Sequence, residues 1–412
     1  MQDGIRKTSG MGIVLFFLIL LPFFDPMCLT YLRQSVDAPD FINLIYYCFI
    51  GGRIAISCIA IVACAKTISL NNDGWLIMFV ISMGAVATLG SSSVFTAVQC
   101  FTYLGLMATL RFLFSKDFKA AVIALIVLFA IYAFGNLWSV YVMHGVIPGE
   151  TPASTIYFFG GKNSIFMHGI PLLISLCACC VARDKKMITV AALLSFLYAY
   201  TAFVVNSLSS LACFLILGLC ILLACYSKSA LAIFKAPYLL AFLVLGFCLT
   251  VIVQHNDFIS FISEMLGRSQ GRSSTLSGRT EIWDQALSYI ASSPLVGHPE
   301  GTLYLMSNGS SADHAHSFFL NIAARYGLVP LLFFLVDIIM ISRRAAPLWH
   351  QPRVALMAIF YFLLLAHSLF DTMDIYIYIL VRTLFLEFIN MGEKSKRLHM
   401  PESKGKKIKG LL

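Results

Sequence analysis

The sequence predicts an all-α membrane protein that crosses the bilayer about twelve times. Hydrophobic residues make up 59% of the 412 residues, charged residues only 12%, and the mean hydropathy is +0.85. A soluble domain cannot bury that much apolar surface. Apolar runs of about 18 residues or more recur along the chain, and a helix of that length crosses a hydrocarbon core of ~30 Å. Because backbone groups in lipid must bond within the chain, and the alternation of a β-barrel is absent, these runs are predicted to be helices.

The predicted spans take up most of the chain. They are 10–32, 41–65, 74–90, 94–114, 120–142, 164–182, 188–205, 207–226, 237–253, 317–341, 354–370 and 375–390. The first follows Arg6 and Lys7 and lacks a cleavage site of small residues. It is therefore interpreted as a retained helix and not as a signal peptide.

The distribution of positive charge predicts the orientation of the chain. With the N-terminus in the cytoplasm, the cytoplasmic loops carry Lys and Arg, while the outer loops are short and poor in cations. The net charge of +9 is mostly a consequence of this bias. Both termini are predicted to be cytoplasmic. Anionic lipid headgroups are favoured over nucleic acid as the partner of the basic tail, residues 391–412.

Two outer loops are longer than the other connections. The chain divides into nine spans over 1–253, an outer loop over 254–316, three spans over 317–390 and the tail over 391–412. Loops as long as 254–316 are usually functional in a compact protein. The second outer loop, 143–163, is shorter. The cysteines lie almost wholly inside spans, so they predict neither a disulfide framework nor a cofactor.

The long outer loop contains the segment SGRTEIWDQALSYIASSP, residues 277–294. Its apolar residues recur at helical spacing, which predicts a short amphipathic helix against the membrane or the bundle. Arg279 would lie in the first turn, where the helix dipole disfavours a cation and favours an anion. Free amides and a guanidinium at one helix start would bind a phosphate well. The alternative is a solvated arginine paired with Glu281 or Asp284.

The segment HAHSFFL, residues 314–320, joins this loop to the tenth predicted span. A histidine at the outer boundary of the membrane can act as a general base near neutral pH, and His316 and His314 are the candidates. The alternative is an interfacial histidine that only satisfies hydrogen bonds. Two histidines also suggest a metal, but Asp313 is the only acid nearby in sequence, so no metal is expected.

Further cations lie on the predicted outer side. Lys162 belongs to FFGGKN, residues 158–163, where two glycines let the backbone approach a ligand closely. The alternative is a loop glycine pair with a snorkelling lysine. Arg268 and Arg272 precede the amphipathic helix and could also meet a phosphate. Charged residues within spans are costly and often functional. Among them are Arg53, Arg325 and Arg382, and Asp25, Asp371 and Asp374 lie near the outer boundary.

Taken in order, SGRTEIW, SPLVGHPEG and HAHSFFLNIAARYGLVPLLFF resemble the bacterial O-antigen ligase and polymerase superfamily over residues 277–334. The resemblance implies a fold similar to C-type glycosyltransferases, without metal or other cofactor, in the bacterial inner membrane. It implies undecaprenyl-diphosphate-linked oligosaccharide as substrate, with a chain-length regulator and a flippase as candidate partners. Arg279 corresponds to the family arginine, His316 to the family histidine and Gly327 to the glycine that follows. Pro330 replaces a small residue.

The resemblance implies a lipid-diphosphate-dependent glycosyltransferase, with Arg279 and His316 as catalytic residues and His314 as an auxiliary. Arg272, Lys162, Arg325 and Arg268 would bind the diphosphate. Ligases commonly carry an arginine in the stretch that is NSLSSLA here, residues 206–212, where Leu208 takes its place. This departure favours a polysaccharide polymerase, for O-antigen, capsule or exopolysaccharide, over an O-antigen ligase. A lipid-linked glycan transporter is the third alternative, although no internal repeat supports it.

Overall fold

The computed structural model describes residues 10–34, 39–64, 70–91, 94–149, 154–179, 185–226, 238–239, 243–245, 279–298, 304–307, 310–312 and 314–398. Helices dominate this part of the chain, beside two three-residue strands. Most of the predicted ninth span, 237–253, lies outside the described residues. The same is true of the outer loop before residue 279, including Arg268 and Arg272.

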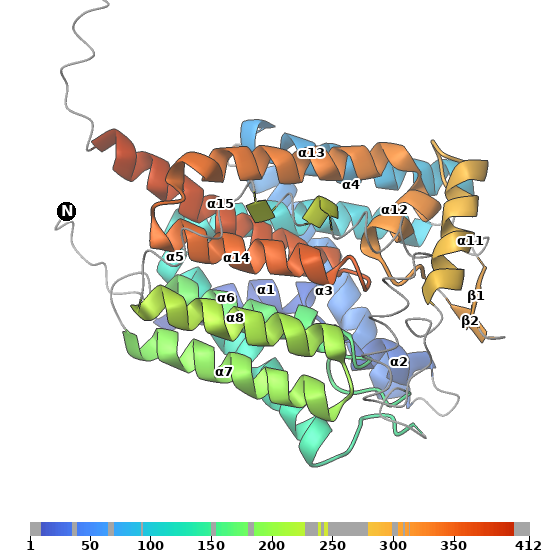
Figure 1. Ribbon diagram of the computed structural model, residues 1–412, viewed down its shortest axis with the longest axis horizontal. Coiled ribbons are helices and arrows are strands. Elements are labelled where there is room, and N and C mark those ends of the chain that lie inside the picture. Colours follow the sequence, from blue (N-terminus) through green and yellow to red (C-terminus); the bar gives the residue numbers. More distant parts are fainter. Residues whose placement is uncertain are drawn as a thin grey trace, which may run out of the picture.

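Most helices run side by side as one bundle (Figure 1). They are α1 (Gly10–Leu20) with the short helix η1 (Leu21–Phe23), α3 (Asp40–Cys64), α4 (Leu70–Ser91), α5 (Val94–Tyr141), α6 (Ser164–Cys179), α7 (Lys185–Val204), α8 (Leu208–Tyr226), α13 (Leu328–Ala345), α14 (Pro352–His367) and α15 (Ile375–Leu398). Within the described residues, five helices are long and apolar enough to cross a membrane, or six if the bent pair α1–η1 and α2 (Cys28–Gln34) is one span. These helices confirm an all-α polytopic membrane protein, but they do not establish twelve spans.

The predicted spans 94–114 and 120–142 are the two parts of α5. The backbone leaves the helical region at Asp117, with φ −155° and ψ 92°. The Asp117 carboxylate accepts a hydrogen bond from the Ala120 amide at 3.0 Å, as an N-cap of the second part does. A short polar side chain at the right position therefore starts a new helix where the first one ends.

The predicted span 317–341 is not continuous. It is broken at Gly327 into α12 (Phe318–Tyr326) and α13. Gly327 has φ +83°, and a Cβ atom there would lie 2.2 Å from the Leu295 carbonyl oxygen. The Leu328 amide donates to the Pro294 carbonyl at 2.7 Å. Glycine is required because the outer-loop segment crosses the helix break at backbone contact, which leaves no room for a side chain.

One end of the bundle, here named the loop end, carries the connections 142–163 and 368–374 together with α11 (Arg279–Ser292), β1 (Leu305–Ser307) and β2 (Ser310–Ala312) (Figure 1). The two strands form an antiparallel hairpin. Helix α11 packs against α12 and β1 through a small apolar cluster. It contains Ile282, Trp283, Ala286, Leu305, Ala315, Leu320 and Ala324. The predicted amphipathic helix is confirmed, and its apolar face lies against the protein.

A buried ion network joins four helices away from the loop end. The Arg382 side chain on α15 is fully buried and donates to both Asp337 carboxylate oxygens, at 2.6 and 2.7 Å. It also donates to Asp73 of α4 at 3.0 Å, and Arg111 of α5 donates to the same Asp73 oxygen at 2.8 Å. These contacts satisfy the charge of Arg382 within the bundle, so its place in a span has a structural explanation.

Candidate active site

The histidine segment forms a turn between the β-hairpin and α12. His314 and His316 face each other with ring centroids 4.3 Å apart. His316 has φ +46°, a left-handed conformation that few non-glycine residues adopt. Such positions cluster at functional sites because the surrounding structure must hold them there. The turn is therefore a constrained part of the loop end, and the structure brings both predicted histidines together.

Trp283 of α11 anchors this turn. Its ring is fully buried, and Nε1–H donates to the Ala315 carbonyl, between the two histidines, at 2.8 Å. Arg279 begins α11 four residues earlier, so its backbone lies one turn, about 6 Å, along the axis on the same helix face. The Arg279 side chain lies outside what the structure describes. Helix α11 is thus bound to the histidine turn through its tryptophan, one helical turn after the residue at which the helix begins.

For the polymerase that the resemblance favours, we expect Trp283→Phe to weaken glycan extension by roughly tenfold while most of the protein stays folded. Phenylalanine keeps the apolar ring but leaves the buried Ala315 carbonyl without its donor, which costs about 1–3 kcal/mol. Chain length of the surface glycan and protein level in the membrane measure the effect. Tyr289→Phe, which removes an exposed hydroxyl contact of the same helix to Tyr304, is the matched control. Full extension by Trp283→Phe would contradict an anchoring role.

Asp371 is the residue of this cluster whose role the sequence did not reveal. One ligating atom from each of His314, His316 and Asp371 lies within 4.8 Å of the others. The Phe318 amide donates to the Asp371 carbonyl at 3.0 Å, which fixes the 368–374 loop beside the histidine turn. Asp371 Oδ2 is buried and has no hydrogen-bond partner among the described residues. A carboxylate there can orient an imidazole.

The same three groups are also of the types that bind a divalent metal. Asp313 is the only acid near the two histidines in sequence, but in the structure Asp371 lies beside them. The fold brings this acid from 55 positions further along the chain, which sequence spacing cannot reveal. The absence of a metal requirement stays a prediction.

Lys162 lies at the loop end, just before α6. A tight turn over 157–160 precedes it, with Gly160 at φ +96° and in close contact with Met27. The next residue, Asn163, accepts a hydrogen bond from Ser207 at 3.1 Å. Lys162 is half-buried and has an interaction partner within the protein. The FFGGKN segment therefore adjoins the start of α8, where Leu208 stands in place of the expected arginine.

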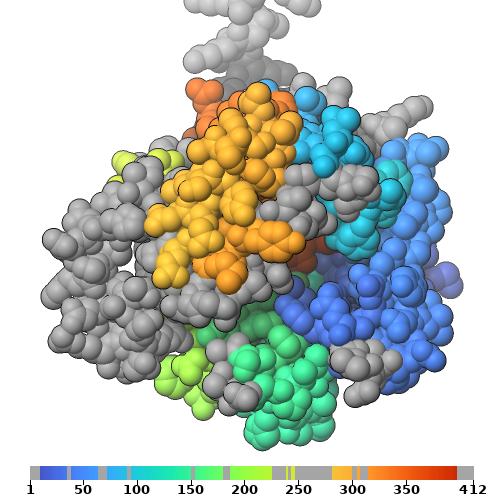
Figure 2. Space-filling model, turned by 90° about the vertical axis from the view of Figure 1, so that its right-hand side faces the viewer, coloured from blue at the N-terminus to red at the C-terminus, as the bar shows by residue number. Residues whose placement is uncertain are grey.

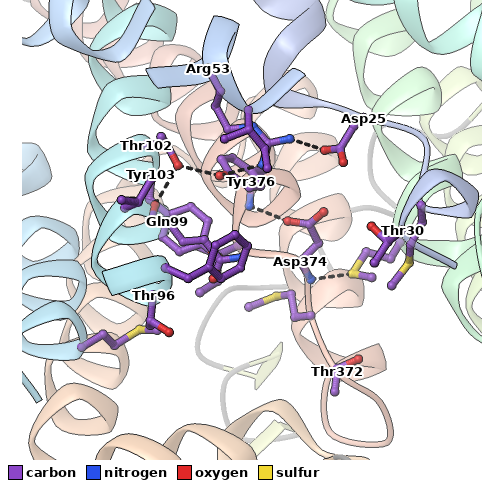
Figure 3. A pocket seen from close by; sticks show the side chains of 18 of the residues that line it. Asp25, Thr30, Arg53, Thr96, Gln99, Thr102, Tyr103, Thr372, Asp374 and Tyr376 are labelled. Carbon is purple, nitrogen blue, oxygen red and sulfur yellow. Dashed lines mark hydrogen bonds and ion pairs between the residues drawn. The ribbon is translucent and has the colours of Figure 1, made fainter. Parts of the chain in front are cut away.

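A pocket of about 390 Å³ lies beside the histidine turn, between α3, α5, α12 and α15. Figure 3 shows Arg53 paired with Asp25 at its wall. The Arg53 guanidinium also donates to the Tyr376 hydroxyl at 3.1 Å, which lies 2.6 Å from the Thr102 hydroxyl. Arg53 was predicted as a costly charge in a span, and the structure places it at this pocket.

Asp374 lines the same pocket from the loop before α15. One of its carboxylate oxygens accepts a hydrogen bond from the Tyr376 amide at 2.8 Å. Burial raises the pKa of Asp374 to about 6. Arg325, by contrast, lies in the last turn of α12, and the pocket is lined by its neighbours Asn321, Ile322 and Tyr326.

Seen onto the loop end, the surface is recessed between the first helices, in blue, and the golden and orange part of the chain that includes α11 (Figure 2). The histidine turn and the pocket are adjacent, because Phe318 lines the pocket two residues after His316. The site therefore combines a candidate general base, a buried carboxylate and a partly open cavity, lined by both polar and apolar side chains, at one end of the bundle.

A comparison with protein families finds a match over residues 187–335 to a family described as O-antigen ligase. The matched segment runs from α7 into α13 and includes α11 and the histidine turn. A search of the curated proteins finds no match. The family match agrees with the resemblance carried by residues 277–334.

Proposed function

We propose that this chain is a polysaccharide polymerase, and the match of residues 187–335 to a family described as O-antigen ligase supports this proposal. It joins undecaprenyl-diphosphate-linked repeat units at the outer face of the bacterial inner membrane. The observation that carries this proposal is the bond of Trp283 to the Ala315 carbonyl, which ties the helix that begins at Arg279 to the turn that holds His316. The twelve-span layout, the similarity to C-type glycosyltransferases and the cytoplasmic termini belong to the same proposal.

The reaction is a single displacement at the anomeric carbon of the donor sugar. A hydroxyl of the acceptor sugar attacks that carbon, the bond to the diphosphate oxygen breaks, and the anomeric configuration inverts. His316 accepts the proton of the attacking hydroxyl, and Asp371 orients the imidazole. The lipid diphosphate leaves with the bonding electron pair. Since the diphosphate already activates the donor, the step needs no nucleotide and no metal.

Cations stabilise the charge that develops on the leaving diphosphate. Arg279 is proposed for this role, assisted by Arg272, Lys162, Arg325 and Arg268. The support differs between them. Lys162 lies at the loop end beside Asn163, which accepts a hydrogen bond from Ser207, and the helix that begins at Arg279 is bound to the histidine turn through Trp283. Arg325 ends α12, while Arg268 and Arg272 lie outside the described residues.

A polymerase is favoured over a ligase by the stretch at the start of α8. Leu208 occupies the position where ligases commonly carry an arginine, and 40% of its surface is exposed. Ser207 and Ser210, on either side of it, bind Asn163 beside Lys162. The O-antigen ligase reaction, transfer of the lipid-linked glycan to lipid A-core, is the second candidate because the family match bears equally on it. A chain-length regulator and a flippase would be partners of the polymerase.

The size profile of surface and lipid-linked glycan in a strain that lacks this chain tests the proposal. A polymerase predicts that single repeat units reach their normal acceptor and that longer chains disappear. Long polymer stranded on the lipid carrier would identify a ligase instead. Repeat units trapped on the cytoplasmic face would indicate a lipid-linked glycan transporter and overturn the enzyme.

A further inference from the structure

The pocket beside the histidine turn has no part in the mechanism above. Its volume, about 390 Å³, lies in the range of small-ligand sites. Side chains from α3, α5, α6, α12 and α15 meet in it, so it forms only when the bundle is assembled. It adjoins the histidine turn, because Phe318 lines it two residues after the candidate base His316.

The charge of the lining argues against an anionic ligand. Arg53 is the only Lys or Arg among the lining residues, and its guanidinium is already bound to Asp25 and Tyr376. Asp374 is the second acidic residue of the lining, besides Asp25. A diphosphate would therefore meet two carboxylates and no uncommitted cation of the lining. The cations proposed above, Arg279 among them, are better suited to bind the diphosphate.

The polar groups of the lining argue equally against the prenyl tail of the lipid carrier. The side chains of Gln99, Asn321, Thr96 and Asp374 all line the cavity. Asn321 Oδ1 and His168 Nε2 are inaccessible to solvent and have no hydrogen-bond partner among the described residues. These two buried atoms lie out of reach of any ligand in the cavity. An apolar chain would, however, remove water from Gln99, Thr96 and Asp374 of the lining without offering them hydrogen bonds, at a substantial cost for each.

The remaining ligand class is an uncharged, hydroxyl-rich molecule. Amide and carboxylate side chains bind hydroxyls, and Tyr103 and Tyr376, with ring centroids 4.6 Å apart, offer apolar ring surface at the same site. We infer that this pocket binds the sugar residue that presents the attacking hydroxyl, the acceptor end of the glycan. This inference rests on the proposed function and adds to it the location of the acceptor subsite. Gln99 and Asn321 are then specificity-determining residues, and Asp374 accepts a hydrogen bond from a sugar hydroxyl.

The test uses the purified full chain in nanodiscs with Gln99→Ala and Asn321→Ala. The donor is the lipid-linked repeat unit of the source strain, and the acceptor probe is the oligosaccharide released from its surface glycan by mild acid. Each variant is expected to raise the KM for the acceptor about tenfold and to leave the KM for the donor unchanged. Hydrolysis of the donor by water should continue at the wild-type rate. Asn43→Ala, on α3 outside the pocket lining, is the matched control.

The outcomes separate the two proposals. An unchanged KM for the acceptor in both variants would overturn the acceptor subsite. A raised KM for the donor or slowed donor hydrolysis would assign the pocket to the lipid carrier and would overturn it as well. If the wild-type chain transfers nothing, the proposed function fails. Binding of the same oligosaccharide by saturation-transfer NMR, lost in Gln99→Ala and kept in Asn43→Ala, would still support the pocket as a glycan site, and equal binding by both variants would refute it.

Discussion

Replacing His316 by alanine is expected to reduce glycan extension by a factor of about 10² to 10⁴ at unchanged protein level, the range typical of a lost general base. The imidazole faces His314 at the loop end and lies beside Asp371, next to the pocket proposed for the acceptor. Without it, the attacking hydroxyl loses the group that is proposed to receive its proton. Length distribution of the surface glycan, together with immunoblots of the membrane fraction, measures the effect.

The left-handed backbone at His316 requires a second variant. Alanine at φ +46° is strained, so a loss of activity could come from the backbone. Asparagine tolerates this conformation better, and His316→Asn should be as inactive as His316→Ala. His314→Ala is expected to have a smaller effect, because His314 has an auxiliary role in the proposal. Normal extension by either His316 variant would remove His316 from the mechanism.

Local patterns in the sequence predicted the helices well. The span boundaries agree with the described helices within a few residues in most cases, because hydropathy over some 20 residues decides whether a segment enters the bilayer. The amphipathic helix at 279–292 is likewise determined by its own apolar spacing.

Features that depend on contacts between distant segments could not be predicted from the sequence. The break at Gly327 exists because residues 294–298 cross there, and those contacts are not encoded in the apolar run 317–341 itself. Asp371 joins the histidines through a loop between two later helices. Arg53 and Arg382 were equally notable in the sequence as charges in spans. Only the fold shows that Arg53 lies at a pocket, whereas Arg382 lies in a buried ion network.

That ion network leads to the largest expected effect on stability. Arg382→Leu should deplete the folded protein from the membrane, because it leaves the Asp337 carboxylate buried with the Tyr378 hydroxyl as its remaining side-chain partner among the described contacts. Removing one partner of a buried ion pair costs about 3–5 kcal/mol, a large share of a typical net stability of about 5–15 kcal/mol. Protein level in the membrane fraction and the melting temperature in detergent measure the loss.

Two further variants test whether the instability of Arg382→Leu comes from an unbalanced buried charge or only from the missing side chain. Arg344→Leu breaks a partly exposed pair with Glu393, and solvent screening should keep its effect smaller. In the double variant Arg382→Leu with Asp337→Leu, both charges are gone and apolar groups fill the space, so much of the lost stability should return. If Arg382→Leu instead accumulated normally with an unchanged melting temperature but without activity, the network would not be structural. Arg382 would then have to act in the reaction.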